Sequence, residues 1–432
     1  MSEEARAESG GVFTDADGVR RRTLIAGAAW TIPVIAVATA SPATAATNDL
    51  KLAFDKSSYS GTGCETIKGA YVTATRGGSA ASGESVTVTL ADGYTFDGGS
   101  TTYTGTTGTD GRLNLPAINV PQKGGDSTFS ATSGSASTSA PVTGAEGGQA
   151  IQVKDKATNS TKVPNGATPL NAGYFLQGTT LYFLDGTVVA SDVAATSTGY
   201  YADGQGNGNY INYRTSDGKL YQAEGTKSTA ASKIPDGATP LNAGYFLKSS
   251  TLYFIDGTKI ATNVAATSDG YYAVDQGNGG NFINYRDSDG KLYQATGNTS
   301  TAASKIPDGA TPLDAGYFLN DGVLYFIDGT EVAKDVAATS TGYYASGQGT
   351  NSNFINYRDK SGKAYQVDAT KATAQSKVPD GATPLNAGYF LKDNVLYFVD
   401  GTKVAENVAA TSTGYYAKDY GNYVDIRTSE CS

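Results

Sequence analysis

A unit of about 72 residues recurs four times along the chain, and this repetition constrains the fold more than any other feature. The copies span residues 162–232, 233–304, 305–376 and 377–432. Repeats of this length are supersecondary units that bury their apolar faces only against neighbouring copies. We therefore expect residues 146–432 to form one repetitive domain.

Each copy contains short runs rich in Tyr, Phe, Ile and Val, separated by Gly, Asp and Asn, as in strands joined by tight turns. Several runs are apolar on both faces, which fits sheets packed between other sheets. The two halves of a copy, GYFL…LYFIDGTKIA and GYYA…FINYRDSDGKLYQA in the second, resemble each other. A building block of about 36 residues is therefore predicted, close to one small propeller blade. Asp-Gly pairs, a strong hairpin signal, occur in every copy, at Asp185-Gly186, Asp256-Gly257, Asp328-Gly329 and Asp400-Gly401.

The ends of the repeat array are offset from each other. The fourth copy stops after Asp425-Ile426-Arg427, without the strand that the third copy has at residues 363–367, and a matching segment at residues 149–153 precedes the first copy. A ring requires this offset, because one sheet is completed by both chain ends. We therefore predict an all-β fold with a closed β-propeller-like ring of eight small blades, each of about three strands. A β-hairpin solenoid is the alternative.

Residues 47–145 have a different composition, rich in Ser, Thr and Gly. Alternating apolar residues at 85–90, with Asp-Gly turns nearby, predict a β-sandwich of about 100 residues. The stretches 106–113 and 125–131 resemble bacterial Ig-like domains of the invasin and intimin kind, which carry T-x-x-x-G and then G-x-x-x-F/V-x-A near their last strands. This resemblance implies a spacer that displays a binding head.

Residues 1–46 are typical of an export signal. Arg20, Arg21 and Arg22 precede the apolar run AGAAWTIPVIAVATA, and Ala43 and Ala45 fit a small-x-small cleavage rule. The segment resembles the twin-arginine signals of secreted actinobacterial proteins, with Arg21 and Arg22 as the pair. Arg20 stands where Ser or Thr usually precedes the pair, so the general secretion route stays open. An uncleaved anchor is the other alternative. We expect a secreted or extracellular protein, with cell-wall association as an option and no stable membrane span in the mature chain.

The composition excludes several kinds of chemistry. The chain has no His, and Met1 and Trp30 are its only Met and Trp. This rules out Ser-His-Asp and Cys-His catalysis and His-ligated zinc. The formal net charge of -9 argues against nucleic acid as a partner. We expect no enzyme activity, no cofactor and no metal site.

Cys64 and Cys431 are the only cysteines. Outside the cell disulfides persist, so a bond between them is expected, tying the sandwich to the end of the ring. Two unpaired thiols are the alternative.

Candidate binding residues fall in paired tyrosines and in the Gly- and Asn-rich segments that follow them. An aromatic face can cover the apolar face of a sugar, and amides can bond its hydroxyls. Neighbours in a strand point to opposite faces, so at most one Tyr of each pair is expected to be free; core packing and solvated turns are the alternatives. The candidates are Tyr200, Tyr201, Gln205, Asn207, Tyr271, Tyr272, Gln276, Asn278, Tyr343, Tyr344, Gln348, Asn351, Tyr415 and Tyr416.

Two further sets of charged residues are interpreted as structural. The stretch 287–290, DSDG, resembles half of a calcium loop, but a plain hairpin turn is favoured because calcium needs several more oxygen ligands. One Arg recurs in every copy and could pair with the Asp of the Asp-Gly turns. These residues are Arg214, Arg286, Arg358 and Arg427.

Together these features predict a secreted or cell-surface, non-catalytic recognition protein. Weak sites repeated around a ring would gain avidity, so multivalent binding of an extracellular glycan, another cell-envelope polymer or a surface protein is expected. A structural envelope component, or a protein–protein adhesion component, is the first alternative. A carboxylate-dependent glycan hydrolase is the second, and it would need a single acidic cleft that breaks the four-fold symmetry.

Overall fold

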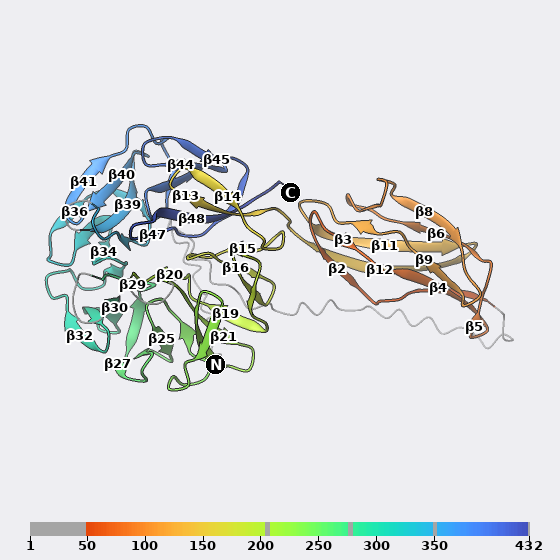
Figure 1. The fold of residues 1–432 in the computed structure, drawn as a ribbon, viewed down its shortest axis with the longest axis horizontal. Helices are drawn as coiled ribbons and strands as arrows, with labels where there is room; N and C mark the ends of the chain where they lie inside the picture. Colours follow the sequence, from red (N-terminus) through yellow and green to blue (C-terminus); the bar gives the residue numbers. More distant parts are fainter. Residues whose placement is uncertain (1–48, 204–207, 275–279, 349–351, 431–432) are drawn as a thin grey trace, which may run out of the picture.

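The computed structural model describes residues 49–203, 208–274, 280–348 and 352–430. Regular secondary structure in these residues consists of strands alone, which confirms the all-β prediction. No helix in this part of the chain is long and apolar enough to cross a membrane. Figure 1 shows an elongated sandwich beside a ring of small sheets.

Residues 50–145 form three sheets around one hydrophobic core. Val86 and Val88 of β6 are fully buried between exposed or half-buried neighbours, as their alternation predicts. The first sheet contains β1 (Leu50–Phe54), β4 (Tyr71–Arg76), β5 (Ser79–Ala80) and β9 (Arg112–Asn114). The second contains β3 (Thr66–Ile67), β10 (Ile118–Asn119) and β7 (Thr95–Phe96). The third contains β2 (Tyr59–Thr62), β12 (Ala136–Ala145), β11 (Gly125–Ser133), β6 (Ser85–Thr89) and β8 (Thr102–Thr106).

Residues 150–428 form eight sheets, two per sequence repeat, of alternating four and five strands. The four-stranded sheets are β15 (Thr168–Pro169), β16 (Tyr174–Gln177), β17 (Thr180–Phe183) and β18 (Val188–Ala190); β24 (Thr239–Pro240), β25 (Tyr245–Lys248), β26 (Thr251–Phe254) and β27 (Lys259–Ala261); β33 (Thr311–Pro312), β34 (Tyr317–Asn320), β35 (Val323–Phe326) and β36 (Glu331–Ala333); and β42 (Thr383–Pro384), β43 (Tyr389–Lys392), β44 (Val395–Phe398) and β45 (Lys403–Ala405).

The five-stranded sheets each add a two- or three-residue strand that contains the Tyr pair. They are β19 (Val193–Thr196), β20 (Tyr200–Tyr201), β21 (Asn209–Thr215), β22 (Leu220–Glu224) and β23 (Lys227–Ala230); β28 (Val264–Thr267), β29 (Tyr271–Tyr272), β30 (Asn281–Asp287), β31 (Leu292–Thr296) and β32 (Thr299–Ala302); β37 (Val336–Thr339), β38 (Tyr343–Tyr344), β39 (Asn353–Asp359), β40 (Ala364–Asp368) and β41 (Lys371–Ala374); and β13 (Ala150–Lys154), β14 (Ala157–Ser160), β46 (Val408–Thr411), β47 (Tyr415–Ala417) and β48 (Gly421–Thr428).

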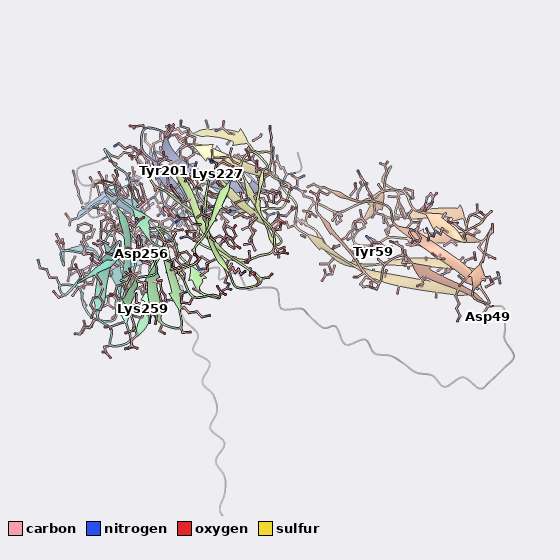
Figure 2. The ribbon with its side chains drawn as sticks, turned by 60° about the horizontal axis from the view of Figure 1, so that its bottom comes forward. Asp49, Tyr59, Tyr201, Lys227, Asp256 and Lys259 are labelled. Atoms are coloured by element: carbon pink, nitrogen blue, oxygen red, sulfur yellow. The ribbon has the colours of Figure 1, made fainter. Side chains whose placement is uncertain are left out.

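The expectation of about three strands per blade is wrong, because every sheet has four or five. The additional strands carry little sequence signal. β15 and its counterparts are two residues long, and every residue of β23 is exposed. Lys227, at the start of β23, is labelled in Figure 2. A strand without apolar alternation is recognised only by its pairing.

The last of these sheets is built from both ends of the repeat array. β13 pairs antiparallel with β48, so that Ile151 lies opposite Ile426 and Val153 opposite Val424. Figure 1 shows this yellow strand beside the dark blue end of the chain. The ring prediction requires such a shared sheet, and a solenoid does not.

Each four-stranded sheet is apolar on both faces because the GYFL run of its second strand buries both aromatic residues. Tyr174 and Phe175 are both 0% exposed, as are their counterparts in the other copies. Tyr174 packs with Ile211 of the following sheet, whereas the equivalent of Phe175 in the second copy, Phe246, packs with Leu220 of the preceding sheet. Neighbouring residues of a strand thus serve two different interfaces.

Eight small hydrophobic cores lie between successive sheets, and the series returns to the sheet with which it began. Phe175 shares a core with Ala150 of the sheet that holds both chain ends, and Tyr389 shares a core with Val424 of that same sheet. The cores, in order around the ring, are centred on Tyr174, Phe246, Tyr245, Phe318, Tyr317, Phe390, Tyr389 and Phe175.

The buried tyrosine hydroxyls also join successive sheets. Tyr245 donates to the backbone oxygens of Asn281 at 2.9 Å and Gly297 at 3.1 Å. At the sheet shared by the chain ends, Tyr389 donates to the oxygens of Asn422 at 2.9 Å and Asp155 at 3.0 Å. The same contact therefore recurs inside the repeats and at the chain ends.

We expect Tyr389→Phe and Tyr245→Phe each to lower the free energy of unfolding by about 1–2 kcal/mol, because each removes a buried hydroxyl hydrogen bond that joins two successive sheets. Guanidinium titrations followed by circular dichroism would measure both. Lys227→Ala, on an exposed strand, should change stability by under about 0.5 kcal/mol. A large loss for Tyr245→Phe with none for Tyr389→Phe would show that the chain ends are not held by the same contact.

Candidate functional site

The four strands that carry the Tyr pairs meet at the centre of the ring. β20 contacts β29 and β47, and β38 contacts the same two strands. The eight tyrosines of these strands line one cavity of about 50 Å³. This space holds on the order of four water molecules and is too small to enclose a sugar ring. We call it the axial pocket.

The first Tyr of each pair is part of the core. Tyr271 is 6% exposed and stacks on Phe282 with ring centroids 5.3 Å apart. Its hydroxyl accepts a hydrogen bond from Gln294, and burial raises its pKa well above the usual value. The same environment surrounds its equivalents Tyr200, Tyr343 and Tyr415.

The second Tyr of each pair is half-buried and lines both the axial pocket and a second, smaller cavity of about 20 Å³. We call this second cavity the mouth of the axial pocket. Gly208 of the same repeat packs against the ring of Tyr201, which is labelled in Figure 2. The contact is so close that a Cβ atom added to Gly208 would lie 2.4 Å from the ring. Gly280 covers Tyr272 in the same way. Only one Tyr of each pair is thus in a position to contact a ligand. The second tyrosines are Tyr201, Tyr272, Tyr344 and Tyr416.

Four different residues border this mouth at one position of the repeat. They are Asp203, Val274, Ser346 and Lys418. Lys418 of the fourth copy forms an ion pair with Asp203 of the first at 3.4 Å. Ser346 accepts a hydrogen bond from Tyr416 at its backbone oxygen. The copies differ in charge and polarity here, although the neighbouring Gly-Tyr-Tyr-Ala is invariant among them.

A layer of hydrogen bonds beneath the tyrosines joins successive copies around the axis. Asn242 accepts from the backbone N–H of Gly199 at 3.0 Å and donates from its amide to Thr198 at 2.7 Å. Asn386 and Asn171 make the same pair of contacts with the copies before them.

This layer loses its symmetry between the second and third copies. Asp314 replaces the Asn and accepts from Gly270 N–H at 2.8 Å, while Asp269 stands where the other copies have Thr. Asp269 therefore occupies the position whose Thr hydroxyl accepts from the Asn amide in the other copies. Both carboxyl groups line the axial pocket. They lie across the axis from the Asp203–Lys418 pair, which joins the first and fourth copies.

Three of the four recurring Arg residues donate to backbone oxygens rather than to the turn carboxylates. Arg214 donates to the carbonyl oxygen of Gly237 in the next sheet at 2.9 Å, and Arg286 does so to Gly309. Arg427 also reaches a carboxylate, Glu146, at 3.0 Å. The expected pairing with the Asp-Gly turns is therefore wrong for these three. Asp256, labelled in Figure 2, accepts the Thr258 N–H of its own turn.

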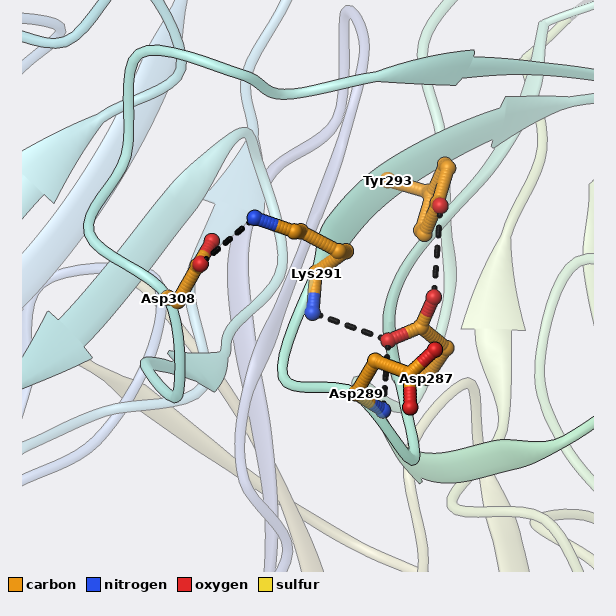
Figure 3. A network of polar contacts seen from close by, with 5 residues as sticks. All are labelled: Asp287, Asp289, Lys291, Tyr293 and Asp308. Atoms are coloured by element: carbon orange, nitrogen blue, oxygen red, sulfur yellow. Dashed lines mark hydrogen bonds and ion pairs between the residues drawn. The ribbon is translucent and has the colours of Figure 1, made fainter.

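The DSDG stretch is a hairpin turn between β30 and β31, as favoured (Figure 3). Asp287 accepts from the backbone N–H groups of Asp289 and Lys291 and from the Tyr293 hydroxyl. The Lys291 ammonium bonds Asp308 at 2.6 Å. Among the described residues no group of three or more acidic, His or Cys side chains is placed to hold a metal ion.

Several predicted residues lie outside the described ranges. They are Arg21, Arg22, Gln205, Asn207, Gln276, Asn278, Asn351 and Cys431. Gln348 is described and half-buried, and it hydrogen-bonds Tyr416. The sulfur of Cys64 lies close to Gly147, at the start of the ring. A Cβ atom added to Gly147 would lie 2.9 Å from that sulfur. The disulfide with Cys431 stays a prediction.

The Asn–Thr layer and its substitution by Asp269 and Asp314 were not among the residues predicted from the sequence. A position-by-position comparison of the four copies contains the signal. At both positions three copies agree and one carries Asp.

We expect Tyr271→Ala to lower the free energy of unfolding by about 3–5 kcal/mol, as for other buried aromatic residues. Tyr272→Ala should have a clearly smaller effect because its ring is half-exposed. Chemical denaturation of the two variants would measure both. Equal losses would place the second Tyr in the core as well and remove it as a contact residue.

We expect Asp314→Asn to raise the free energy of unfolding at pH 7 by about 1–2 kcal/mol, because an amide can donate to the Asp269 carboxylate. Asn386→Asp, at the matched position, should lower it, because it places a carboxylate at a site that is only 4% exposed. Denaturant titrations at pH 7 test both signs. A stability loss for Asp314→Asn would contradict this interpretation.

No family model and no curated protein matches the sequence. Among solved structures, BamB from Moraxella catarrhalis is similar at 11% identity and a TM-score of 0.32, covering 65% of this chain and 97% of that chain. A quinonprotein alcohol dehydrogenase-like protein from Bacteroides thetaiotaomicron has 11% identity and a TM-score of 0.27, covering 86% and 97%. The adhesin InvE from Yersinia pseudotuberculosis has 13% identity and a TM-score of 0.19, covering 42% and 46%. Likeness at this level carries no statement about what the chain binds.

Proposed function

We propose that this chain is a secreted or cell-surface, non-catalytic recognition protein whose ring binds a glycan or another surface polymer at the mouth of the axial pocket. The observation that carries the proposal is the convergence of four half-buried tyrosines on one mouth. Aromatic rings held in fixed positions bind the apolar faces of sugars at low entropic cost. The tyrosines are Tyr201, Tyr272, Tyr344 and Tyr416.

The variation around the mouth supports a ligand that is not four-fold symmetric. Four different side chains stand at equivalent places: Asp203 and Lys418, which pair with each other, together with Val274 and the buried Ser346. Binding sites commonly consist of variable residues that are held in place by a constant scaffold. The multivalency expected from four copies then takes the form of several weak contacts to one ligand.

The size of the pocket sets how a polymer would bind. With about 50 Å³ available, a sugar ring does not fit inside. The polymer would lie across the mouth, with one small group directed toward the axis. A buried scissile bond would not fit either, so the Asp269 and Asp314 carboxyl groups are not offered as a hydrolytic pair.

The Ig-like resemblance and the export signal extend the proposal to where the ring acts. The sandwich would hold the ring away from the cell, and residues 1–46 would direct export by the twin-arginine or the general route. A structural or protein-adhesion role remains the alternative, in which the mouth binds no glycan.

The purified chain without residues 1–46 should bind at least one polysaccharide on an array of bacterial cell-wall and capsular glycans. The double variant Tyr272→Ala/Tyr344→Ala should lose at least about tenfold in affinity, since each stacking contact is worth about 1 kcal/mol.

Tyr253→Ala is the matched control, because Tyr253 is also half-buried but packs with Leu220 and Ile234 away from the mouth. Circular dichroism would verify that each variant is folded. Absence of binding by the folded chain would overturn the glycan proposal in favour of a structural or protein-binding role. Equal losses in the control would show that the mouth is not the site.

A further inference from the structure

The sheet that holds both ends of the array lacks a connection that the other five-stranded sheets have. In those sheets a hairpin turn with a Gly joins the long strand to the next one, at residues 216–219, 288–291 and 360–363. In this sheet, which we call the closing sheet, β48 and β13 pair in the same way but come from opposite ends of the array. The chain enters β13 from the sandwich instead, through residues 146–148, which we call the linker.

The residue after the linker takes the place of the residue that ends the hairpin turn. In the first copy the N–H of Thr215, at the end of β21, donates to the backbone oxygen of Lys219 at 3.0 Å. In the closing sheet the N–H of Thr428, at the end of β48, donates to the backbone oxygen of Gln149 at 3.0 Å. The chain that arrives from the sandwich thus makes the contact that the turn makes elsewhere.

The last residue of the linker takes the place of the Gly of the turn. Gly218 accepts a hydrogen bond from the N–H of Gly237 in the next sheet at 2.7 Å, and Gly148 accepts one from Gly166 at 2.9 Å. Gly148 has a φ of 119°, and a Cβ atom added to it would lie 1.8 Å from the backbone oxygen of Thr428. Only Gly fits this position, because any side chain would overlap β48.

The linker is held just as closely by the sandwich. Ala145, the last residue of β12, pairs with Thr62 of β2 and accepts from the N–H of Gly63 at 2.8 Å. The N–H of Gly147 donates to the backbone oxygen of Gln122 at 2.8 Å. A Cβ atom added to Gly147 would lie 2.2 Å from the oxygen of Gly63, so the linker backbone lies directly on the sandwich.

The recurring Arg of the fourth copy also serves the linker. Arg214 of the first copy donates to the oxygen of Gly237 in the next sheet at 2.9 Å. Its counterpart Arg427, which is buried, donates to the oxygen of Gly147 at 2.5 Å and to the carboxylate of Glu146 at 3.0 Å. Gly147 is therefore bound to the sandwich through its N–H and to the ring through its oxygen.

The pairing of β48 with β13 is also held at its centre. Asp425 is fully buried and accepts from the Gln152 amide of β13 at 3.0 Å and from the N–H of Gly173, just before β16, at 2.9 Å. Side chains thus join the two strands in the middle, and the linker joins them at the end next to the sandwich. The closing sheet gives the linker a fixed support.

We propose that the linker is a rigid joint, which replaces the missing turn of the closing sheet and makes the sandwich and the ring move as one body. Domains of one chain move relative to each other where few contacts cross their boundary, whereas every linker residue here is bonded to the ring. Figure 1 shows the ring face-on and the sandwich lengthwise beside it. The joint keeps the axial pocket open at the side of the sandwich rather than at its tip. It does not depend on the proposed recognition role.

The first test is ¹⁵N relaxation of the purified chain without residues 1–46. A single rotational diffusion tensor should fit the amides of both the sandwich and the ring, because a rigid body tumbles as a unit. Hydrogen exchange of the same protein gives a second readout. The amides of Gly166 and Gly309 have equivalent acceptors, Gly148 and Gly290, and should be protected to within about tenfold of each other. Separate tensors, or an unprotected Gly166 beside a protected Gly309, would overturn the joint.

The second test compares Arg427→Ala with its matched control Arg286→Ala, which removes the equivalent Arg from inside the repeats. Arg427→Ala should lower the protection of the Gly147 and Gly166 amides by at least about tenfold, because a hydrogen bond from a charged donor is lost at the joint. Arg286→Ala should lower the protection of Gly309 and leave that of Gly147 and Gly166 unchanged. Equal effects of the two variants on Gly147 and Gly166, or no effect of Arg427→Ala, would refute the joint. The wild-type measurements decide the matter if Arg427→Ala does not fold.

Discussion

The burial of every sheet of the ring on both faces is the constraint on which the rest of the structure depends. An isolated unit of four or five short strands cannot bury two apolar faces, so each requires a neighbour on either side. Tyr174 and Phe175 direct adjacent aromatic rings to opposite interfaces. A stack of such sheets would leave one apolar face exposed at each end. The pairing of β13 with β48 removes both ends by giving the first and last sheets a common member.

Because the sheets close into a ring, one strand of every second sheet points to the central axis, and a binding site can form there. The strands with the Tyr pairs come together at the centre, so four copies of one short sequence line one pocket. Repetition alone would make this pocket four-fold symmetric. Asp203 with Lys418 on one side, and Asp269 with Asp314 on the other, remove the symmetry where a ligand would be contacted. Asp425 removes it at the meeting of the chain ends.

Sequence reasoning predicted much of the fold and part of the site. The all-β class, the two related halves of each copy and the Asp-Gly turns are all seen, because Tyr, Phe and Gly in regular order report strands and turns directly. The strand count was underestimated, because β23 and its equivalents are fully exposed and have no apolar alternation. The Tyr pairs were predicted to have at most one free residue each, and the first Tyr of each pair is in the core; that the second binds a ligand stays a prediction. The Arg pairing was wrong because a guanidinium satisfies a carbonyl as readily as a carboxylate, and sequence does not tell which lies nearby.

The amino-acid sequence by itself determined the repeating unit, its strand content and the offset between its first and last strands, because these depend on local composition and period. Only the tertiary structure decided that the four Tyr pairs share one pocket, that its volume excludes a sugar ring, and that Asp425 contacts Gln152 and Gly173. The pocket draws its tyrosines from all four copies, and the contacts of Asp425 join residues more than 250 positions apart. They arise from the closing of sheets about an axis, which no local pattern encodes.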